Sequence, residues 1–72
     1  TRGAEVVQAL LDFSKHTKSS IRIACLRGLG KTGTDEAYER LVEALERDTN
    51  TGARGAAASG LGTLGRPEAV AA

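Results

Sequence analysis

The sequence of this 72-residue chain repeats itself after 32 residues, and this repeat limits the possible folds more than any other feature. When residues 22–40 are laid over residues 54–72, eight of the nineteen positions are identical, whereas composition alone would give about two. A match of this quality predicts a chain built from copies of one structural unit. The identical pairs are Arg22/Arg54, Ala24/Ala56, Gly28/Gly60, Leu29/Leu61, Gly30/Gly62, Gly33/Gly65, Glu36/Glu68 and Ala37/Ala69.

Apolar side chains recur within this repeat at the spacing of an α-helix. An i, i+3, i+4, i+7 stripe covers one face of a helix and does not fit the alternation of a strand. The stripe is Tyr38, Leu41, Val42 and Leu45, and it returns 32 residues earlier as Val6, Ala9, Leu10 and Phe13. The sequence therefore predicts an all-α fold. Residues 1–16 would hold the second helix of a partial repeat, 17–48 a complete repeat, and 49–72 another partial repeat.

The helix limits of the complete repeat are expected from capping residues and glycines. Its first helix is predicted at about 20–29, with the hydroxyl of Ser19 or Ser20 as its N-terminal cap. Gly30 and Gly33 are expected to end this helix, because glycine tolerates the left-handed conformation. The second helix is expected to begin near 34 or 35, and Asn50 or Thr51 to cap the next. The predicted buried stripe of the first helix is Ile21, Ala24, Cys25, Gly28 and Leu29.

These residues resemble the HEAT family of helical repeats, in the short variety named after phycobilin lyases. The resemblance covers the whole chain and implies a right-handed α-α superhelix of antiparallel helix pairs, similar to armadillo proteins. It rests on Ile21-Arg22, Ala24-Cys25, Gly28-Leu29-Gly30 and Gly33, and on Ala53-Arg54, Ala56-Ala57, Gly60-Leu61-Gly62, Gly65 and Pro67-Glu68-Ala69-Val70.

The same resemblance implies an arginine–aspartate ladder that links neighbouring repeats. Arg22 and Arg54 would be its basic members, with Asp48 as the acidic partner. At the previous rung His16 stands where the family has aspartate, and histidine is a poorer substitute for an anion. The ladder is therefore expected around Asp48 and is in doubt at His16.

The run Gly28-Leu29-Gly30-Lys31-Thr32-Gly33 imitates a nucleotide-binding loop. It fits G-x-G-x-x-G, and Gly-Lys-Thr ends a phosphate-binding loop, but both motifs need a strand before the glycines. Here a helical stretch precedes them. The glycines also recur at residues 60–65 without the lysine, and a feature that repeats with the structural period belongs to the structure. No nucleotide site is predicted.

The sequence predicts a non-catalytic chain without a metal site or cofactor. Its single cysteine, Cys25, and single histidine, His16, exclude an intrachain disulfide and a Cys/His zinc cluster. Cys25 lies on the predicted buried stripe and is interpreted as a small core residue. Carboxylates line one face of the second helix, but charge runs of this kind are usually solvated and do not indicate an acid/base pair.

Charge is unevenly distributed within the complete repeat. Residues 15–31 carry five basic and no acidic side chains (+5), whereas residues 35–48 carry six acidic and two basic ones (−4). The resemblance implies that second helices line the concave, partner-binding surface, which would suit a basic or amphipathic protein segment. An alternative is that the apolar members of this face merely cover a preceding repeat. The predicted partner face is Val7, Leu11, Glu39, Glu43 and Glu46.

Three classes of function are compatible with these features. The favoured one is a protein–protein interaction scaffold, a fragment of a longer helical-repeat protein whose flanking repeats are also partners. The alternatives, from family analogy, are a chromophore-handling accessory subunit similar to phycobilin lyases and a nucleic-acid-binding helical scaffold. A net charge of +1 argues against nucleic acid, and no apolar run approaches the roughly 18 residues that span a membrane. A lone cysteine and no glycosylation sequon favour a reducing compartment such as the cytoplasm.

Overall fold

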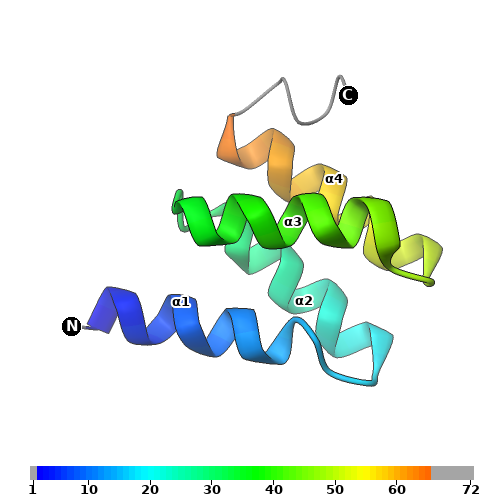
Figure 1. Ribbon diagram of the computed structural model, residues 1–72, viewed down its shortest axis with the longest axis horizontal. Helices are drawn as coiled ribbons and strands as arrows, with labels where there is room; N and C mark the ends of the chain where they lie inside the picture. Colours follow the sequence, from blue (N-terminus) through cyan, green and yellow to red (C-terminus); the bar gives the residue numbers. More distant parts are fainter. Residues whose placement is uncertain (1, 66–72) are drawn as a thin grey trace.

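The computed structural model describes residues 2–65, which form four α-helices and no strand (Figure 1). Each helix runs roughly opposite to the one before it, so α1 and α3 point the same way, and α2 and α4 pass behind α3. The all-α fold with helical hairpins predicted from the sequence is confirmed for this part of the chain. The helices are α1 (Arg2–Phe13), α2 (Ser19–Gly30), α3 (Asp35–Arg47) and α4 (Thr51–Leu64).

Polar side chains cap the amino ends of α3 and α4, as the sequence suggests. The Thr34 hydroxyl accepts a hydrogen bond from the backbone N–H of Ala37 at 3.2 Å. The Asn50 side chain accepts from the N–H of Ala53 at 3.0 Å. Each cap satisfies a backbone donor that has no partner inside its helix. The expected start of the second helix at residue 34 or 35 is thereby confirmed.

The start of α2 differs from the sequence prediction. Lys18 occupies the N-cap position and makes no side-chain cap, so neither Ser19 nor Ser20 caps the helix. Instead, His16 Nδ1 accepts a hydrogen bond from the backbone N–H of Lys18 at 3.0 Å. An imidazole that precedes the helix therefore orders the turn that leads into α2.

Large and small apolar side chains from α2, α3 and α4 form the core. The predicted stripe of α2 is confirmed at Leu29 and wrong at Ala24, which is exposed. Cys25 is only partly buried, whereas Leu26, outside the predicted stripe, is fully buried. The reason is that α2 turns Leu26 and Gly30 towards the core it shares with α4. The buried apolar residues are Leu26, Leu29, Ala37, Leu41, Ala44, Ala53, Ala56, Ala57 and Leu61.

Two glycines bring α2 and α4 into backbone contact. A Cβ atom added to Gly30 would lie 2.6 Å from both the Cα and the carbonyl oxygen of Gly60, far inside van der Waals contact. Gly30 is the last residue of α2, as expected, but it does not take the left-handed conformation and instead serves close packing. Gly33 does take the positive φ, at 71°, that the turn after α2 requires.

The apolar stripe of α1 is less covered than its counterpart on α3. Val6 and Phe13 are each 56% exposed, whereas Leu41 is completely buried against the α2–α4 pair. None of the four described helices is long and apolar enough to cross a membrane. The second helix expected in the last repeat falls within 66–72, outside the described residues, and the repeat limits stay predictions.

Candidate interaction groove

Three adjoining hollows follow α1 and α3 along their length and make one continuous groove, here called the α1–α3 groove. The first hollow encloses about 700 Å³, the second about 410 Å³ and the third about 430 Å³. Leu11 and Glu36 line both the first and the second, while Lys15, Arg40 and Glu43 line both the second and the third. Because α1 and α3 run in the same direction, the groove begins at their amino ends and finishes at their carboxyl ends.

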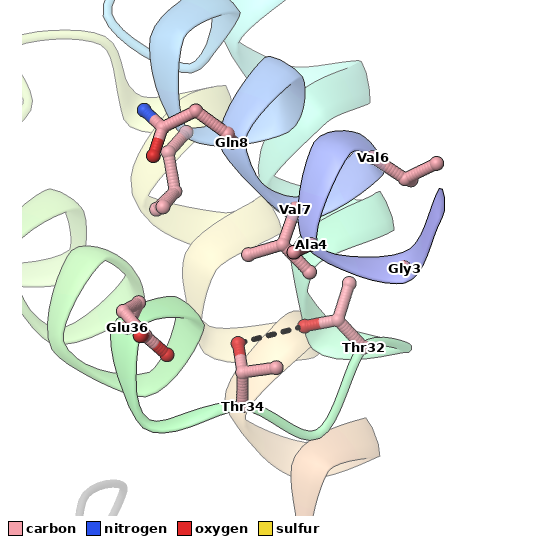
Figure 2. Close-up of a pocket in the computed structure, with 9 residues that line it drawn as sticks. Gly3, Ala4, Val6, Val7, Gln8, Thr32, Thr34 and Glu36 are labelled. Atoms are coloured by element: carbon pink, nitrogen blue, oxygen red, sulfur yellow. Dashed lines mark hydrogen bonds between the residues drawn. The ribbon is translucent and has the colours of Figure 1, made fainter. Parts of the chain in front are cut away.

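The amino end of the groove is mainly apolar. Val7 and Leu11 are half-buried side chains of α1 that line the first hollow. Figure 2 shows Val7 above the linked hydroxyls of Thr32 and Thr34, whose oxygens are 3.2 Å apart, with Glu36 on the α3 side. This end therefore presents aliphatic surface to the solvent beside a single carboxylate.

The middle of the groove is acidic along its α3 wall. Glu36, Glu39 and Glu43 are exposed and line the second hollow. Glu36 and Glu39 make no ion pair or hydrogen bond through their side chains within residues 2–65. Their carboxylates are therefore free to attract a cation from outside the chain.

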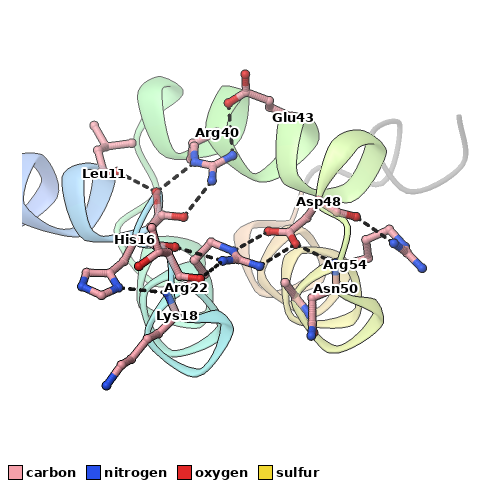
Figure 3. Close-up of polar contacts among 12 residues, drawn as sticks. Leu11, His16, Lys18, Arg22, Arg40, Glu43, Asp48, Asn50 and Arg54 are labelled. Carbon is pink, nitrogen blue, oxygen red and sulfur yellow. Dashed lines mark hydrogen bonds and ion pairs between the residues drawn. The ribbon is translucent and has the colours of Figure 1, made fainter.

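Arg40 ties the middle of α3 to the end of α1. Its Nε donates to the Ser14 hydroxyl at 2.9 Å, its Nη2 to the Ser14 carbonyl at 2.8 Å, and its Nη1 to Glu43 Oε1 at 3.1 Å. Ser14 is fully buried, and its hydroxyl donates to the carbonyl of Leu11 at 2.6 Å. The guanidinium is thereby held in place as part of the groove floor (Figure 3).

Below the carboxyl end of the groove, Arg22 forms a bidentate ion pair with Asp48 (Figure 3). Arg22 Nε lies 3.0 Å from Asp48 Oδ2, and Nη2 lies 3.1 Å from Oδ1. Its Nη1 donates to the carbonyls of His16 and Thr17. The hydrogen bonds that Arg22 donates to the Asp48 carboxylate hold the pKa of Asp48 below its ordinary value, although burial acts in the opposite direction. The Asp48 side chain is 6% exposed, so solvent screens the pair only weakly.

The helical hairpins match a family of known proteins. The family model for HEAT repeats matches residues 1–62. The chain belongs to the HEAT repeat family. No curated protein and no solved structure matches it. HEAT repeats usually act as protein-interaction scaffolds and are generally non-catalytic, whereas the family match does not single out the phycobilin-lyase variety.

Within this HEAT repeat segment, His16 and Asp48 perform the same local task 32 positions apart. Asp48 Oδ1 accepts from the backbone N–H of Asn50 at 2.9 Å, just as His16 Nδ1 accepts from Lys18. Arg54 Nη1 donates a hydrogen bond to the backbone carbonyl of Asp48 at 2.7 Å and makes none to the Asp48 carboxylate. Histidine therefore reproduces the turn-forming half of the aspartate's role, and the structure pairs the carboxylate of Asp48 with Arg22.

The predicted partner face is assembled in part. Val7, Leu11, Glu39 and Glu43 line the α1–α3 groove, whereas Glu46 lines none of its three hollows. The groove also includes Glu36, Lys15 and Arg47, which the sequence interpretation did not place on this face. Glu36, Glu43 and Arg47 follow an i, i+7, i+11 spacing, which keeps side chains on one helix face and would have identified Glu36 and Arg47.

The surroundings of Cys25 do not favour a reactive thiolate. Burial raises the pKa of the Cys25 thiol, which lowers its thiolate fraction and hence its nucleophilicity. Among residues 2–65, no group of three or more His, Cys, Asp or Glu side chains could hold a metal ion. What the groove offers is non-covalent: aliphatic surface, carboxylates and fixed cations.

Proposed function

We propose that this HEAT repeat segment is part of a protein-interaction scaffold whose α1–α3 groove binds a basic, amphipathic segment of a partner protein. The observation that carries the proposal is the pairing of opposite walls. Val7 and Leu11 stand on α1, and the unpaired carboxylates of Glu36 and Glu39 stand on α3. A segment with alternating or helically spaced apolar and basic residues would contact both walls at once.

Each wall would contribute differently to binding. Covering Val7 and Leu11 removes aliphatic surface from water, at about 25 cal/mol for each Å². The carboxylates raise the association rate of cationic partners and repel anionic ones. This repulsion lowers the affinity for an anionic segment by more than the attraction raises the affinity for a basic one. The apolar wall is thus expected to supply most of the affinity, and the acidic wall most of the selectivity.

The test is a titration of the chain with a fluorescent peptide of about twelve residues that carries three lysines and two leucines, followed by anisotropy. Two charge reversals are compared, Glu39→Lys inside the groove and Glu46→Lys outside it. Both change the net charge by the same amount and both positions are exposed. We expect Glu39→Lys to weaken binding about tenfold, or about 1.4 kcal/mol, and Glu46→Lys to change it less than about threefold.

Equal losses in the two variants would place the attraction in the overall charge of the chain and not in the groove. Absence of saturable binding to the unmodified chain would reject the proposal. Far-ultraviolet circular dichroism of each variant establishes that the helices are retained, so that a loss of binding is not a loss of fold.

A further inference from the structure

We propose that the α1–α3 groove distinguishes the two ends of its partner, because its carboxyl end binds acidic residues of the same segment whose basic residues lie at the Glu36–Glu39 end. The inference rests on the proposed function, since it adds a second recognition element to the same groove. The expected ligand is a protein segment with an apolar residue, then basic residues, then one or two carboxylates, in that spatial order along the groove.

The charges that are already paired in the structure account for this polarity. Arg22 is neutralised by Asp48, and Arg40 by Glu43 with further hydrogen bonds to Ser14. After these pairs are set aside, the acidic side chains facing the second hollow outnumber the basic ones. The third hollow has the opposite balance.

Two cations are left over at the carboxyl end. Lys15 and Arg47 both line the third hollow, both are exposed, and neither makes a side-chain hydrogen bond or ion pair within residues 2–65. Lys15 follows the end of α1 and Arg47 is the last residue of α3, so they face the groove from its two walls. A carboxylate placed between them would be attracted by both.

The helix dipoles at this end act in opposite directions. α1 and α3 direct their carboxyl ends to the third hollow, where negative partial charge acts against an acidic ligand, whereas α2 begins beside the same hollow and its amino end acts in favour of one. The preference for carboxylates at this end therefore depends on the side chains of Lys15 and Arg47. Removing those two charges should abolish the preference without changing the fold.

The spacing of the two charged ends sets the length of the ligand. Glu39 and Arg47 are eight residues apart on α3, which corresponds to about 12 Å along the helix at about 1.5 Å for each residue. An extended segment rises about 3.3 Å for each residue and needs about four residues to cover that distance. The basic and acidic residues of an extended partner should therefore be about four positions apart.

Three fluorescent peptides of about twelve residues test the inference by anisotropy at low salt. In the first peptide the charges are separated: two leucines are followed by three lysines, and two glutamates follow the lysines about four positions further on. The second replaces the glutamates with glutamines. The third has the composition of the first with lysines and glutamates alternating. We expect the first peptide to bind about tenfold more tightly than either of the others, and the difference to shrink as salt is raised.

The matched variants are Lys15→Gln/Arg47→Gln and Arg27→Gln/Lys31→Gln. The second pair removes the same charge from exposed positions of the chain that line none of the three hollows. The first variant should bind the glutamate and glutamine peptides equally and hold the glutamine peptide as tightly as the unmodified chain does. The second variant should keep the tenfold difference.

The possible outcomes separate this inference from the proposed function. If the glutamate and glutamine peptides bind the unmodified chain equally, the carboxyl end does not recognise acidic residues, and the inference fails while the proposed function stands. Equal binding of the separated and alternating peptides overturns the spatial order. If none of the three peptides binds, the proposed function itself fails. Self-association that occupies the groove and is lost in Lys15→Gln/Arg47→Gln would make a second copy of the chain the ligand and also overturn the inference.

Discussion

The molecule contains two pairs of parallel helices, α2 with α4 and α1 with α3. The first pair is in close contact, whereas the second pair is held apart. α2 and α4 approach until the backbones at Gly30 and Gly60 touch. α1 and α3 are separated by a groove lined with long side chains such as Leu11 and Glu39. The size of the facing side chains decides the difference: small residues let helices close on each other, and large or charged ones keep a surface open.

The closed α2–α4 side and the open α1–α3 side contribute unequally to the free energy of folding. Leu26, Leu41 and Leu61 are fully buried on the closed side, and burial of one such side chain contributes about 1.5–3 kcal/mol. On the open side Val7 and Leu11 remain half-exposed, and under the proposed function a partner would complete their burial. The chain thus gains most of its folding free energy from the α2–α4 side and leaves the other side open, where the proposed partner would bind.

The largest difference between the two sides is expected when one large side chain is removed from each. Leu41→Ala should lower the free energy of unfolding by about 2–5 kcal/mol, because the cavity cannot collapse fully beside the glycine contact. Val6→Ala, at a position 56% exposed, should change it by less than about 0.5 kcal/mol. Urea denaturation followed by circular dichroism measures both. Similar losses in the two variants would show that α1 is packed as tightly as α3.

The next test adds one methyl group to each of two glycines. Gly30→Ala should destabilise by about 1–3 kcal/mol, because the new Cβ would meet the backbone of Gly60. Gly62→Ala places its Cβ where no other part of residues 2–65 beyond its own helix backbone lies within 4 Å, and alanine favours a helix interior by about 1 kcal/mol over glycine. The two substitutions should therefore shift the urea midpoint in opposite directions. A stabilising Gly30→Ala would contradict the backbone contact.

The smallest effect concerns the edge where the two sides meet. Asp48→Asn should cost about 1 kcal/mol at neutral pH, since asparagine keeps one acceptor but loses the charge that pairs with Arg22.

This cost also has a defined pH dependence. Because the folded-state pKa of Asp48 is lowered, its contribution is fully present above the ordinary aspartate pKa of about 4. The contribution is lost as pH falls through the lower folded value. Urea denaturation at pH 7 and near pH 3 should show the wild-type advantage shrinking in acid, and a constant advantage would mean that charge is not its source.

The sequence predicted α3 well and α2 less well, for a reason visible in their patterns. Along α3 the apolar residues are separated by charged ones, so the helical spacing identifies a single face. Along α2 the run from Ile21 to Leu26 is interrupted only by Arg22, and such a run fits several registers. Packing against α4 then decides in favour of Leu26 and against Ala24.

The candidate site was predictable as a face but not as a connected groove. Val7, Leu11 and Glu39 could be grouped from helical spacing and the 32-residue offset. The tie between Arg40 and Ser14 joins residues 26 positions apart, and no local pattern indicates it. Without that tie, the sequence offers no means of telling a paired arginine from an unpaired one, and so no way of locating the unpaired cations at the carboxyl end.

The contact between Gly30 and Gly60 also controls a dimension on the opposite side of the molecule. α1 packs on α2 and α3 packs on α4, so the separation of α2 and α4 sets how far apart α1 and α3 stand. The width of the groove therefore depends on Gly30 and Gly60, which lie on the opposite side of the molecule from the groove. An exchange of glycine for alanine at the contact between α2 and α4 would therefore change the width of the groove while leaving every groove-lining side chain unchanged.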